Sequence, residues 1–273
     1  MSTTSYDTAR QQAGNNWQRA GEAWGHAANE WACLYEHYSL DVLLAVYSRL
    51  GVGPGTNLLD IACGSGLSVR VADSMGATVS GLDAAAELLA VARERTPDAD
   101  LRLGSMFELP WADVSFDAAV SINGIWGGCE DALREAFRVL RPGGLIGISF
   151  WGAGPPLDLR KFFKIFAMHS PPEHVGSMRQ LNNISVVGVA EEMLTSTGFV
   201  VTERGRRTSV IEWPDAEVAW RAVSSLGPAV PALRSGDLDA VKRDILAALE
   251  SCRHAGGIYR SKNDHHFVMA RKP

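Results

Sequence analysis

Residues 57–66, with the sequence NLLDIACGSG, constrain the fold of this chain more than any other stretch. Leu58 to Ile61 is a short apolar run typical of a buried strand, and the turn from Ala62 to Gly66 leads into a helix expected to begin near Leu67. Glycines in such a turn let the backbone approach a ligand closely. The positive end of the following helix faces the turn and suits an anionic group. The stretch therefore predicts a strand–turn–helix unit that holds a carboxylate or a phosphate.

The spacing of the glycines decides between possible ligands of this turn. A dinucleotide fold requires a third glycine, and Val69 stands at that place. A P-loop requires a Gly-Lys-Ser/Thr run, and the turn contains no lysine. On these residues alone, a Gly-rich turn without any ligand remains an alternative.

Strands and helices are expected to alternate along most of the chain. The expected strands cover residues 58–61, 77–82, 101–103, 117–122, 145–151, 199–203, 258–260 and 266–270. Helices are expected over 16–50, 67–74, 84–95, 130–140, 157–169, 189–197, 216–226 and 237–252. Such alternation indicates βαβ units and a parallel sheet with right-handed crossovers. We expect an α/β, Rossmann-like, doubly wound and mostly parallel sheet of seven strands.

The chain shows no linker long enough to separate two domains, so residues 1–273 are expected to form one domain. Within it we expect an N-terminal helical cap (1–56) and a ligand-binding half (57–152). An insert or lid (153–187) and the C-terminal part of the sheet with its helices (188–273) are expected to follow.

Composition excludes several classes of partner. A net charge of −5 offers no basic excess for nucleic acid, and no apolar run approaches the roughly 20 residues that span a bilayer. The N-terminus lacks the pattern of a secretory signal. The cysteines at 33, 63, 129 and 252 form no C-x-x-C pair, and the histidines form no H-E-x-x-H pattern, so we expect no metal site and a cytoplasmic location. The sequence leaves the oligomeric state open, and a homodimer or higher homo-oligomer is compatible with it.

Aromatic residues recur every seventh position before the first strand, at Trp17, Trp24, Trp31 and Tyr38. On a continuous helix they would form one stripe. The stripe either packs on the body of the protein or lies over the ligand as a lid. Gly21 and Gly25 weaken the helix locally, which suits a segment that hinges.

Asp83 is expected at the tip of the second strand. In nucleotide-binding α/β folds an acidic side chain at this place accepts hydrogen bonds from the ribose hydroxyls. Ala84 is small, so an adenine ring could lie flat on the backbone beside it. An exposed aspartate that caps the next helix is the alternative role of Asp83.

Three stretches resemble the class I S-adenosylmethionine-dependent methyltransferases, and among them the small-molecule, type 11-like group. These are the D-x-x-C-G-x-G run at 60–66, GSMFELPWADVSFDAAVS at 104–121, and RVLRPGG at 138–144. The second follows the family pattern G-D-A-x-x-L-P-F-x-D-x-S-F-D-x-V-x-S closely. Ser105 departs from it, because the family commonly has an aspartate there that bonds the adenine amino group. The backbone N–H of Met106 could still serve a ring nitrogen.

The resemblance implies S-adenosyl-L-methionine as cofactor and a methyl group moved to an oxygen, nitrogen or carbon of a small molecule, such as a secondary metabolite. The implied cofactor-binding residues are Trp24, Asp60, Ala62, Gly64, Gly66, Asp83, Ala84, Ser105, Met106 and Ser121. A positive sulfonium favours aromatic neighbours, and Trp24, Trp126 and Trp151 are candidates to line the mouth around it. Trp126 follows the fourth expected strand and Trp151 ends the fifth, so both lie at the carboxyl edge of the sheet. His169 and His174 are candidate bases, but the sequence assigns no catalytic residue.

Two other functions remain open from the sequence. The chain could bind the cofactor without catalysis, as a sensor does. It could also be an NAD-dependent oxidoreductase, which Val69 in place of the third glycine disfavours.

Overall fold

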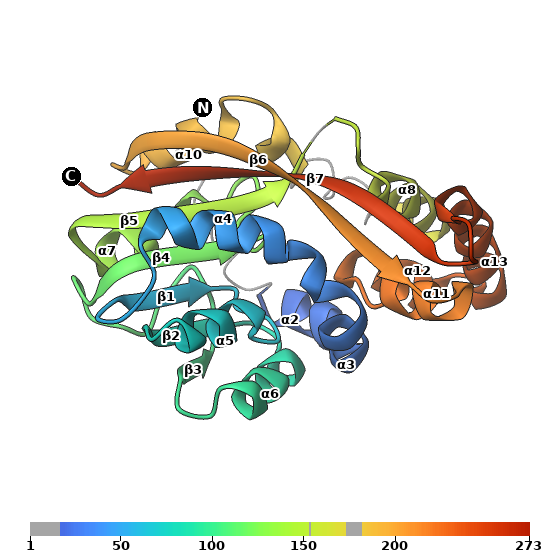
Figure 1. Ribbon diagram of the computed structural model, residues 1–273, viewed down its shortest axis with the longest axis horizontal. Coiled ribbons are helices and arrows are strands. Elements are labelled where there is room, and N and C mark those ends of the chain that lie inside the picture. The colour runs from blue at the N-terminus through green and yellow to red at the C-terminus, as the bar shows by residue number, and fades with distance from the viewer. Residues whose placement is uncertain (1–16, 153, 173–181) are drawn as a thin grey trace.

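The computed structural model describes residues 17–152, 154–172 and 182–273. In these residues a seven-stranded sheet runs in the order β3-β2-β1-β4-β5-β7-β6 (Figure 1). Its strands are β1 Asn57–Ile61, β2 Thr78–Asp83, β3 Asp100–Leu103, β4 Phe116–Ile122, β5 Leu140–Trp151, β6 Val200–Trp213 and β7 Tyr259–Arg271. The strands β1 to β5 are parallel to one another, whereas β7 is antiparallel to both β5 and β6. The expected doubly wound, mostly parallel sheet of seven strands is confirmed.

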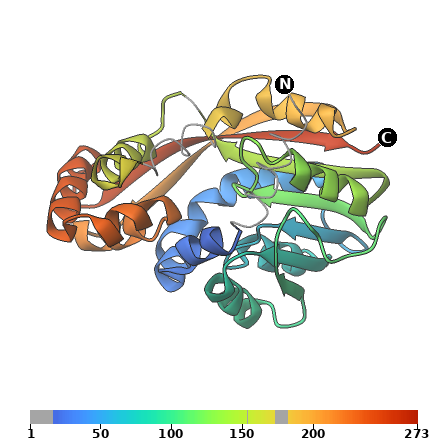
Figure 2. The ribbon, with the colours of Figure 1, turned by 180° about the vertical axis from the view of Figure 1, so that it is seen from behind.

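Helices cover both faces of this sheet. The α-helices of the described residues are α2 Trp17–Gly25, α3 Ala28–Glu30, α4 Leu40–Leu50, α5 Leu67–Ser74, α6 Ala86–Arg95, α7 Glu130–Val139, α8 Leu159–His169, α10 Val189–Ser196, α11 Ala216–Ser224, α12 Val230–Ser235 and α13 Leu238–Leu249. Helices α4, α5 and α6 lie on the face seen in Figure 1, and α7 and α10 lie on the face seen in Figure 2. Successive strand residues point to opposite faces, so Leu58 packs with the first group and Leu59 with the second. Burial on both faces explains why these strands read as continuous apolar runs.

Strands β6 and β7 extend far beyond the rest of the sheet. β7 pairs with β5 from His265 to Arg271, but its pairing with β6 continues back to Tyr259. Helices α8, α11, α12 and α13 gather around the projecting ribbon (Figure 1), where Phe162, Trp213 and Ile245 belong to one apolar cluster. The sequence predicted only short strands here, because the polar middle of β6, RGRRTS, carries no apolar alternation. Hydrogen-bonded pairing with β7 keeps this part of β6 in a strand, although its residues have low strand propensity. The strands expected at 258–260 and 266–270 are parts of the single strand β7.

The N-terminal segment is not the continuous helix expected over 16–50. After α2 and α3 the chain forms a π-helix at Trp31–Tyr35 and a 3₁₀ turn at Glu36–Ser39 before α4 begins. Gly21 lies inside α2, whereas α2 ends at Gly25. Both glycines also allow close packing. A Cβ on Gly21 would lie 2.0 Å from the carbonyl oxygen of Ala84. A Cβ on Gly25 would lie 2.2 Å from Oε2 of Glu87. These glycines let α2 pack directly on α6 and the turn before it.

Candidate functional site

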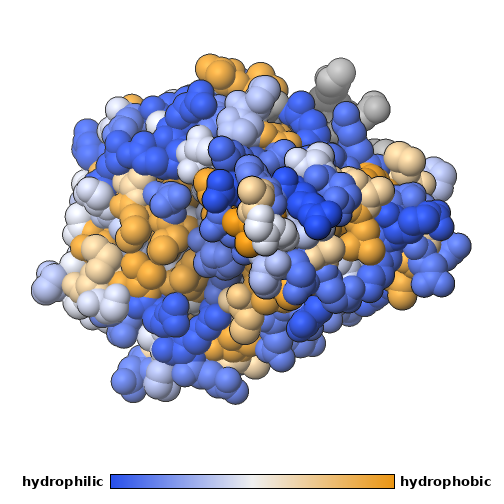
Figure 3. Space-filling view, turned by 45° about the vertical axis from the view of Figure 1, so that its right-hand side comes forward, coloured by the Kyte–Doolittle hydropathy of each residue, from blue (hydrophilic) through white to orange (hydrophobic). Residues whose placement is uncertain are grey.

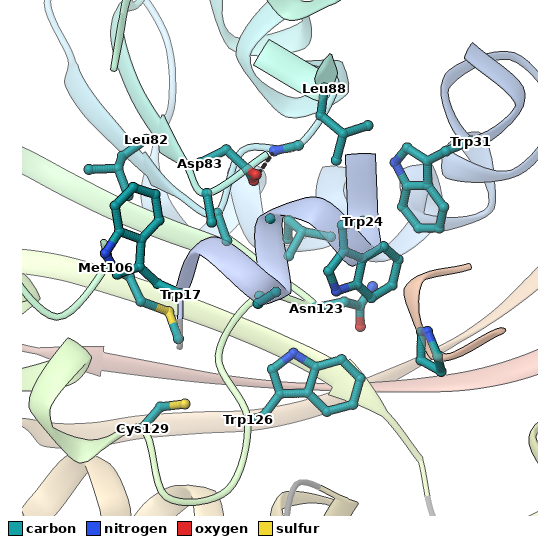
Figure 4. Close-up of a pocket in the computed structure, with 18 of the residues that line it drawn as sticks. Trp17, Trp24, Trp31, Leu82, Asp83, Leu88, Met106, Asn123, Trp126 and Cys129 are labelled. Carbon is teal, nitrogen blue, oxygen red and sulfur yellow. Dashed lines mark hydrogen bonds between the residues drawn. The ribbon is translucent and has the colours of Figure 1, made fainter. Parts of the chain in front are cut away.

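A cavity of about 570 Å³ opens at the carboxyl ends of the parallel strands, beneath α2. This volume lies within the range of ordinary small-molecule sites, roughly 300–1,000 Å³. Asp83 after β2, Asn123 after β4 and Trp151 at the end of β5 reach its wall. Figure 4 shows Trp24 and Trp31 descending from the N-terminal segment toward Asn123. The cavity thus lies where open α/β sheets bind ligands.

The turn after β1 has a left-handed backbone at three positions. Ala62, Gly64 and Gly66 have φ values of 62°, 56° and 81°. Ala62 and Gly64 line the cavity. Gly66 acts in packing instead, because a Cβ there would lie 2.8 Å from the Cβ of Ala92 on α6. The left-handed Ala62 costs about 1–2 kcal/mol relative to an ordinary conformation, so the surrounding structure must hold it.

Asp83 connects this turn to the end of β2. Its Oδ2 accepts a hydrogen bond from the N–H of Gly64 at 2.7 Å, and its Oδ1 accepts one from the N–H of Ala85 at 2.8 Å. Burial raises the pKa of the Asp83 carboxyl, and the backbone N–H groups oppose that shift. Each carboxylate oxygen can accept a further hydrogen bond. Because Asp83 also lines the cavity, the carboxylate can receive the paired hydroxyls of a ribose.

Five of the other predicted cofactor-binding residues reach the cavity wall, among them Ala62 of the turn after β1. Ala84 follows Asp83 there, Met106 comes from the segment after β3, and Trp24 comes from α2 (Figure 4). Gly64 completes the set. The structure therefore brings together residues that lie far apart in the sequence.

The side chains of Asp60 and Ser121 are occupied inside the sheet beside the cavity. Oδ2 of Asp60 accepts a hydrogen bond from the hydroxyl of Ser68, and burial raises the pKa of this carboxyl to about 7. The hydroxyl of Ser121 donates to the carbonyl of Ile61 at 2.8 Å. Both hold the strand ends around the turn, and neither is among the described residues that line the cavity.

Ser105, the residue that departs from the family pattern, uses its hydroxyl locally. Its Oγ accepts a hydrogen bond from the N–H of Phe107 at 3.2 Å. Among the described lining residues, its neighbours Gly104 and Met106 reach the cavity and Ser105 does not. An adenine contact through Ser105 stays a prediction.

The aromatic repeat lines the cavity in spite of the broken helix. Trp17, Trp24, Trp31 and Tyr38 all reach its wall. The rings of Trp24 and Trp31 meet edge to face at 5.1 Å, and those of Trp31 and Tyr38 at 6.2 Å. The π-helical turn shifts the chain between them, and the rings still converge on one space. The aromatics are therefore both packed against one another and exposed to the cavity.

The opposite wall combines the two expected tryptophans with an unexpected polar residue. Trp126 and Trp151 meet edge to face at 5.3 Å. Asn123, which the sequence did not single out, donates from Nδ2 to the hydroxyl of Tyr38 at 3.0 Å. Its left-handed φ of 58° marks it as a constrained position, and a polar Asn-Gly pair directly after an apolar strand was the signal available in the sequence.

The candidate bases do not face the cavity in the described part of the chain. His169 on α8 pairs with Asp244 at 2.8 Å, away from the lining residues. His174 lies outside the described residues. His265 is fully buried, its ring lies 5.1 Å from that of Tyr38, and burial lowers its pKa to about 3. His266 instead bonds Asp264 and Arg204 on the other side of β7.

No helix in the described ranges combines the length and the apolar character needed to cross a membrane.

A doubly wound sheet with a Gly-rich first turn and a carboxylate at the end of its second strand belongs to the α/β proteins that bind nucleotide-containing ligands. Comparison with known proteins narrows this class. Residues 59–148 match the family model described as "Methyltransferase domain". A malonyl-[acyl-carrier protein] O-methyltransferase of Serratia marcescens is 31% identical over 212 residues, which cover 74% of this chain and 76% of the relative. The chain therefore belongs to the class I S-adenosylmethionine-dependent methyltransferases and is an enzyme of that family.

Further relatives agree on the class and differ in the acceptor that their names state. A demethylmenaquinone methyltransferase of Renibacterium salmoninarum is 29% identical over 66% of this chain and 72% of its own. Among solved structures, the YcgJ protein of Bacillus subtilis has a TM-score of 0.59 at 16% identity, covering 85% of this chain and 98% of that one. A Haemonchus contortus phosphoethanolamine N-methyltransferase, solved with S-adenosylhomocysteine, has a TM-score of 0.53 at 22% identity over 85% of this chain and 52% of its own. These structural likenesses concern the fold.

Proposed function

We propose that this chain binds S-adenosylmethionine in the cavity beneath α2 and transfers its methyl group to a small molecule that enters the aromatic end. The observation that carries the proposal is the position of Asp83, which lines the cavity and is held by the N–H of Gly64 from the Gly-rich turn. Its remaining acceptor sites suit ribose hydroxyls. Gly64 and Ala62 would then lie beside the methionine end, and Ala84 and Met106 beside the adenine.

Three other predicted residues, Gly66, Asp60 and Ser121, support this site although they do not line the cavity. Gly66 sets the distance between α5 and α6, while Asp60 and Ser121 hold the strand ends. Trp24 provides an aromatic face where the sulfonium would lie, and such faces attract cations. The chain would act as one domain, in which the N-terminal segment and the helices around the β6–β7 ribbon enclose the acceptor.

The residues of this chain would accelerate the transfer by alignment and exclusion of water. A bound sulfonium supplies an already activated methyl group. The protein has to hold the nucleophile in line with it, and fixed orientation alone contributes a large share of such rate enhancements. The tryptophans around the cavity exclude water from the reacting atoms. The names of the relatives state different acceptors, so the acceptor of this chain has to be inferred from the shape and polar groups of its cavity.

Calorimetry with S-adenosylhomocysteine and with NADH tests the cofactor. We expect the first to bind and the second not to bind. Asp83→Asn should lower the affinity for S-adenosylhomocysteine at least about tenfold. The substitution removes the charged group that would accept hydrogen bonds from two ribose hydroxyls. Asp73→Asn, which removes an exposed carboxylate on α5, is the matched control and should bind normally.

Tight binding of NADH would contradict the choice of cofactor. An Asp83→Asn protein with unchanged S-adenosylhomocysteine affinity and an unchanged melting temperature would contradict the assignment of the ribose contact.

A further inference from the structure

The polar groups at the aromatic end of the cavity converge on the hydroxyl of Tyr38. Asn123 donates to this oxygen from Nδ2 at 3.0 Å, and Trp151 donates to it from Nε1 at 3.1 Å. A phenolic oxygen that accepts two hydrogen bonds has used its acceptor capacity, so its own hydrogen must point to a third group. Within the described residues these two are the hydrogen bonds of Tyr38, and Tyr38 lines the cavity. Its hydrogen is therefore available to a molecule bound there.

The charges around the cavity restrict what that molecule can carry. Asp83 is the charged side chain among the described lining residues, and no arginine or lysine is among them. A phosphate or another permanent anion remote from the sulfonium would lose its water without gaining a partner. One negative oxygen close to the sulfonium would be compensated by the charge of the methyl donor itself. The cavity therefore suits an acceptor with a single anionic or enolic oxygen.

The described wall also offers no group suited to removing a proton from the acceptor. Burial raises the pKa of Tyr38 well above its usual range and that of Cys129 to about 11. Asp83 is held by backbone N–H groups at the other end of the cavity. A protonated amine would bind the aromatic faces, but it has no free electron pair to give. An oxygen that is already ionised in solution needs no base.

We propose that the acceptor is a flat aromatic molecule carrying an enolic or phenolic oxygen acidic enough to be ionised at neutral pH, and that Tyr38, oriented by Asn123 and Trp151, donates a hydrogen bond to that oxygen. The proposal rests on the proposed function and specifies its acceptor. The acceptor loses its proton to solvent before binding. Its electron pair then forms the bond to the methyl carbon as the carbon–sulfur bond breaks, with that bond's electrons remaining on sulfur. The charges of donor and acceptor cancel, and the products are a neutral thioether and a methylated acceptor.

The test uses the full chain saturated with sinefungin, an S-adenosylmethionine analogue that carries an ammonium group in place of the sulfonium, and two bicyclic probes, 4-hydroxycoumarin and coumarin. The probes share their rings, and only the first has the enolic oxygen. Calorimetry should show that 4-hydroxycoumarin binds at least about tenfold more tightly, as hydrogen bonds to charged groups allow. Tyr38→Phe should abolish this preference and leave the affinities for S-adenosylhomocysteine and coumarin unchanged. Tyr35→Phe is the matched control, because the Tyr35 ring packs 4.9 Å from that of Tyr38 but is not among the lining residues.

Trp151→Phe is the second variant should Tyr38→Phe fold poorly. It keeps an aromatic ring and removes one of the two donors that orient the Tyr38 hydrogen, so the preference should fall part of the way. A preference that survives in both variants would overturn the role of Tyr38. If the sinefungin complex does not bind 4-hydroxycoumarin, the acceptor class is overturned. It is also overturned if tryptamine binds this complex as tightly as 4-hydroxycoumarin does. Failure to bind S-adenosylhomocysteine would instead refute the proposed function.

Discussion

Removal of the Arg95 guanidinium should destabilise the protein far more than removal of an ordinary surface arginine. Arg95, at the end of α6, pairs with the carboxylate of Glu36 and donates to the carbonyls of Ser65 and Ala32 at 3.0 Å each. The Glu36 side chain is 7% exposed, and its other oxygen accepts from the hydroxyl of Ser65. This cluster fastens the segment that carries Trp31 to the Gly-rich turn.

The expected size follows from the charge that Arg95→Ala leaves behind. An unpaired buried carboxylate costs about 3–5 kcal/mol, which corresponds to a fall in melting temperature of roughly 6–20 °C for a chain of this size. Arg253→Ala is the control, because Arg253 and Glu250 form a pair in which both side chains are more than half exposed. Such a pair contributes about 0–1 kcal/mol. Calorimetric melting of both variants gives the comparison.

The pH dependence supplies an independent check on the cause. Burial raises the pKa of Glu36 in the folded protein above its ordinary value of 4.5, although Arg95 and Ser65 lower it. Loss of Arg95 raises the pKa of Glu36 in the folded protein further. The Glu36 carboxyl of the variant therefore takes up a proton more readily in the folded state than in the unfolded state. The penalty of Arg95→Ala is therefore largest at neutral pH and shrinks as the pH falls toward 4.5. Glu36→Gln added to Arg95→Ala should recover part of the loss at neutral pH.

Equal melting temperatures for Arg95→Ala and Arg253→Ala at pH 7 would refute the reasoning. So would a penalty for Arg95→Ala that does not change between neutral and acidic pH, since the loss would then come from packing alone.

Three further variants test other parts of the structure. Gly66→Ala should destabilise more than Gly143→Ala in melting experiments, because both have positive φ but only the first would bring a Cβ to 2.8 Å from Ala92. Ser105→Asp should leave S-adenosylhomocysteine affinity within about twofold or tighten it, because either side chain can accept the N–H of Phe107, and marked weakening in calorimetry would show another role. Deletion of residues 1–27 removes α2 and should leave a soluble α/β body. The deletion should lower the affinity for S-adenosylhomocysteine at least about tenfold, because α2 covers the cavity. Normal affinity would contradict that role.

The sheet and the place of Asp83 at the cavity were predictable because their signals are local. The apolar run of β1, the glycines after it and Asp83 at the end of β2 lie within one βαβ unit. Backbone geometry ties such a motif to one place in the fold, whatever the rest of the chain does. The fold class and the position of Asp83 follow from that constraint.

The contacts that complete the site were not predictable, because they join distant residues through polar atoms. Tyr38 meets Asn123 across 85 positions, and Glu36 meets Arg95 across 59. Hydropathy periodicity records which face of an element is buried, and it carries no information on which polar groups pair. The length of β6 was not predicted for a related reason, since its polar middle is held by pairing with β7 rather than by an apolar pattern.

The two ends of the cavity therefore depend on different parts of the chain. The turn after β1 and Asp83 form the end at which we propose that the cofactor binds, and they come from the stretch that matches the family model. Much of the aromatic end comes from the N-terminal segment, which precedes that stretch, and from Trp151, which follows it. Substitutions in these outer segments can change the acceptor wall without disturbing the βαβ unit. This division gives a physical reason why relatives that are about 30% identical to this chain carry names with different acceptors.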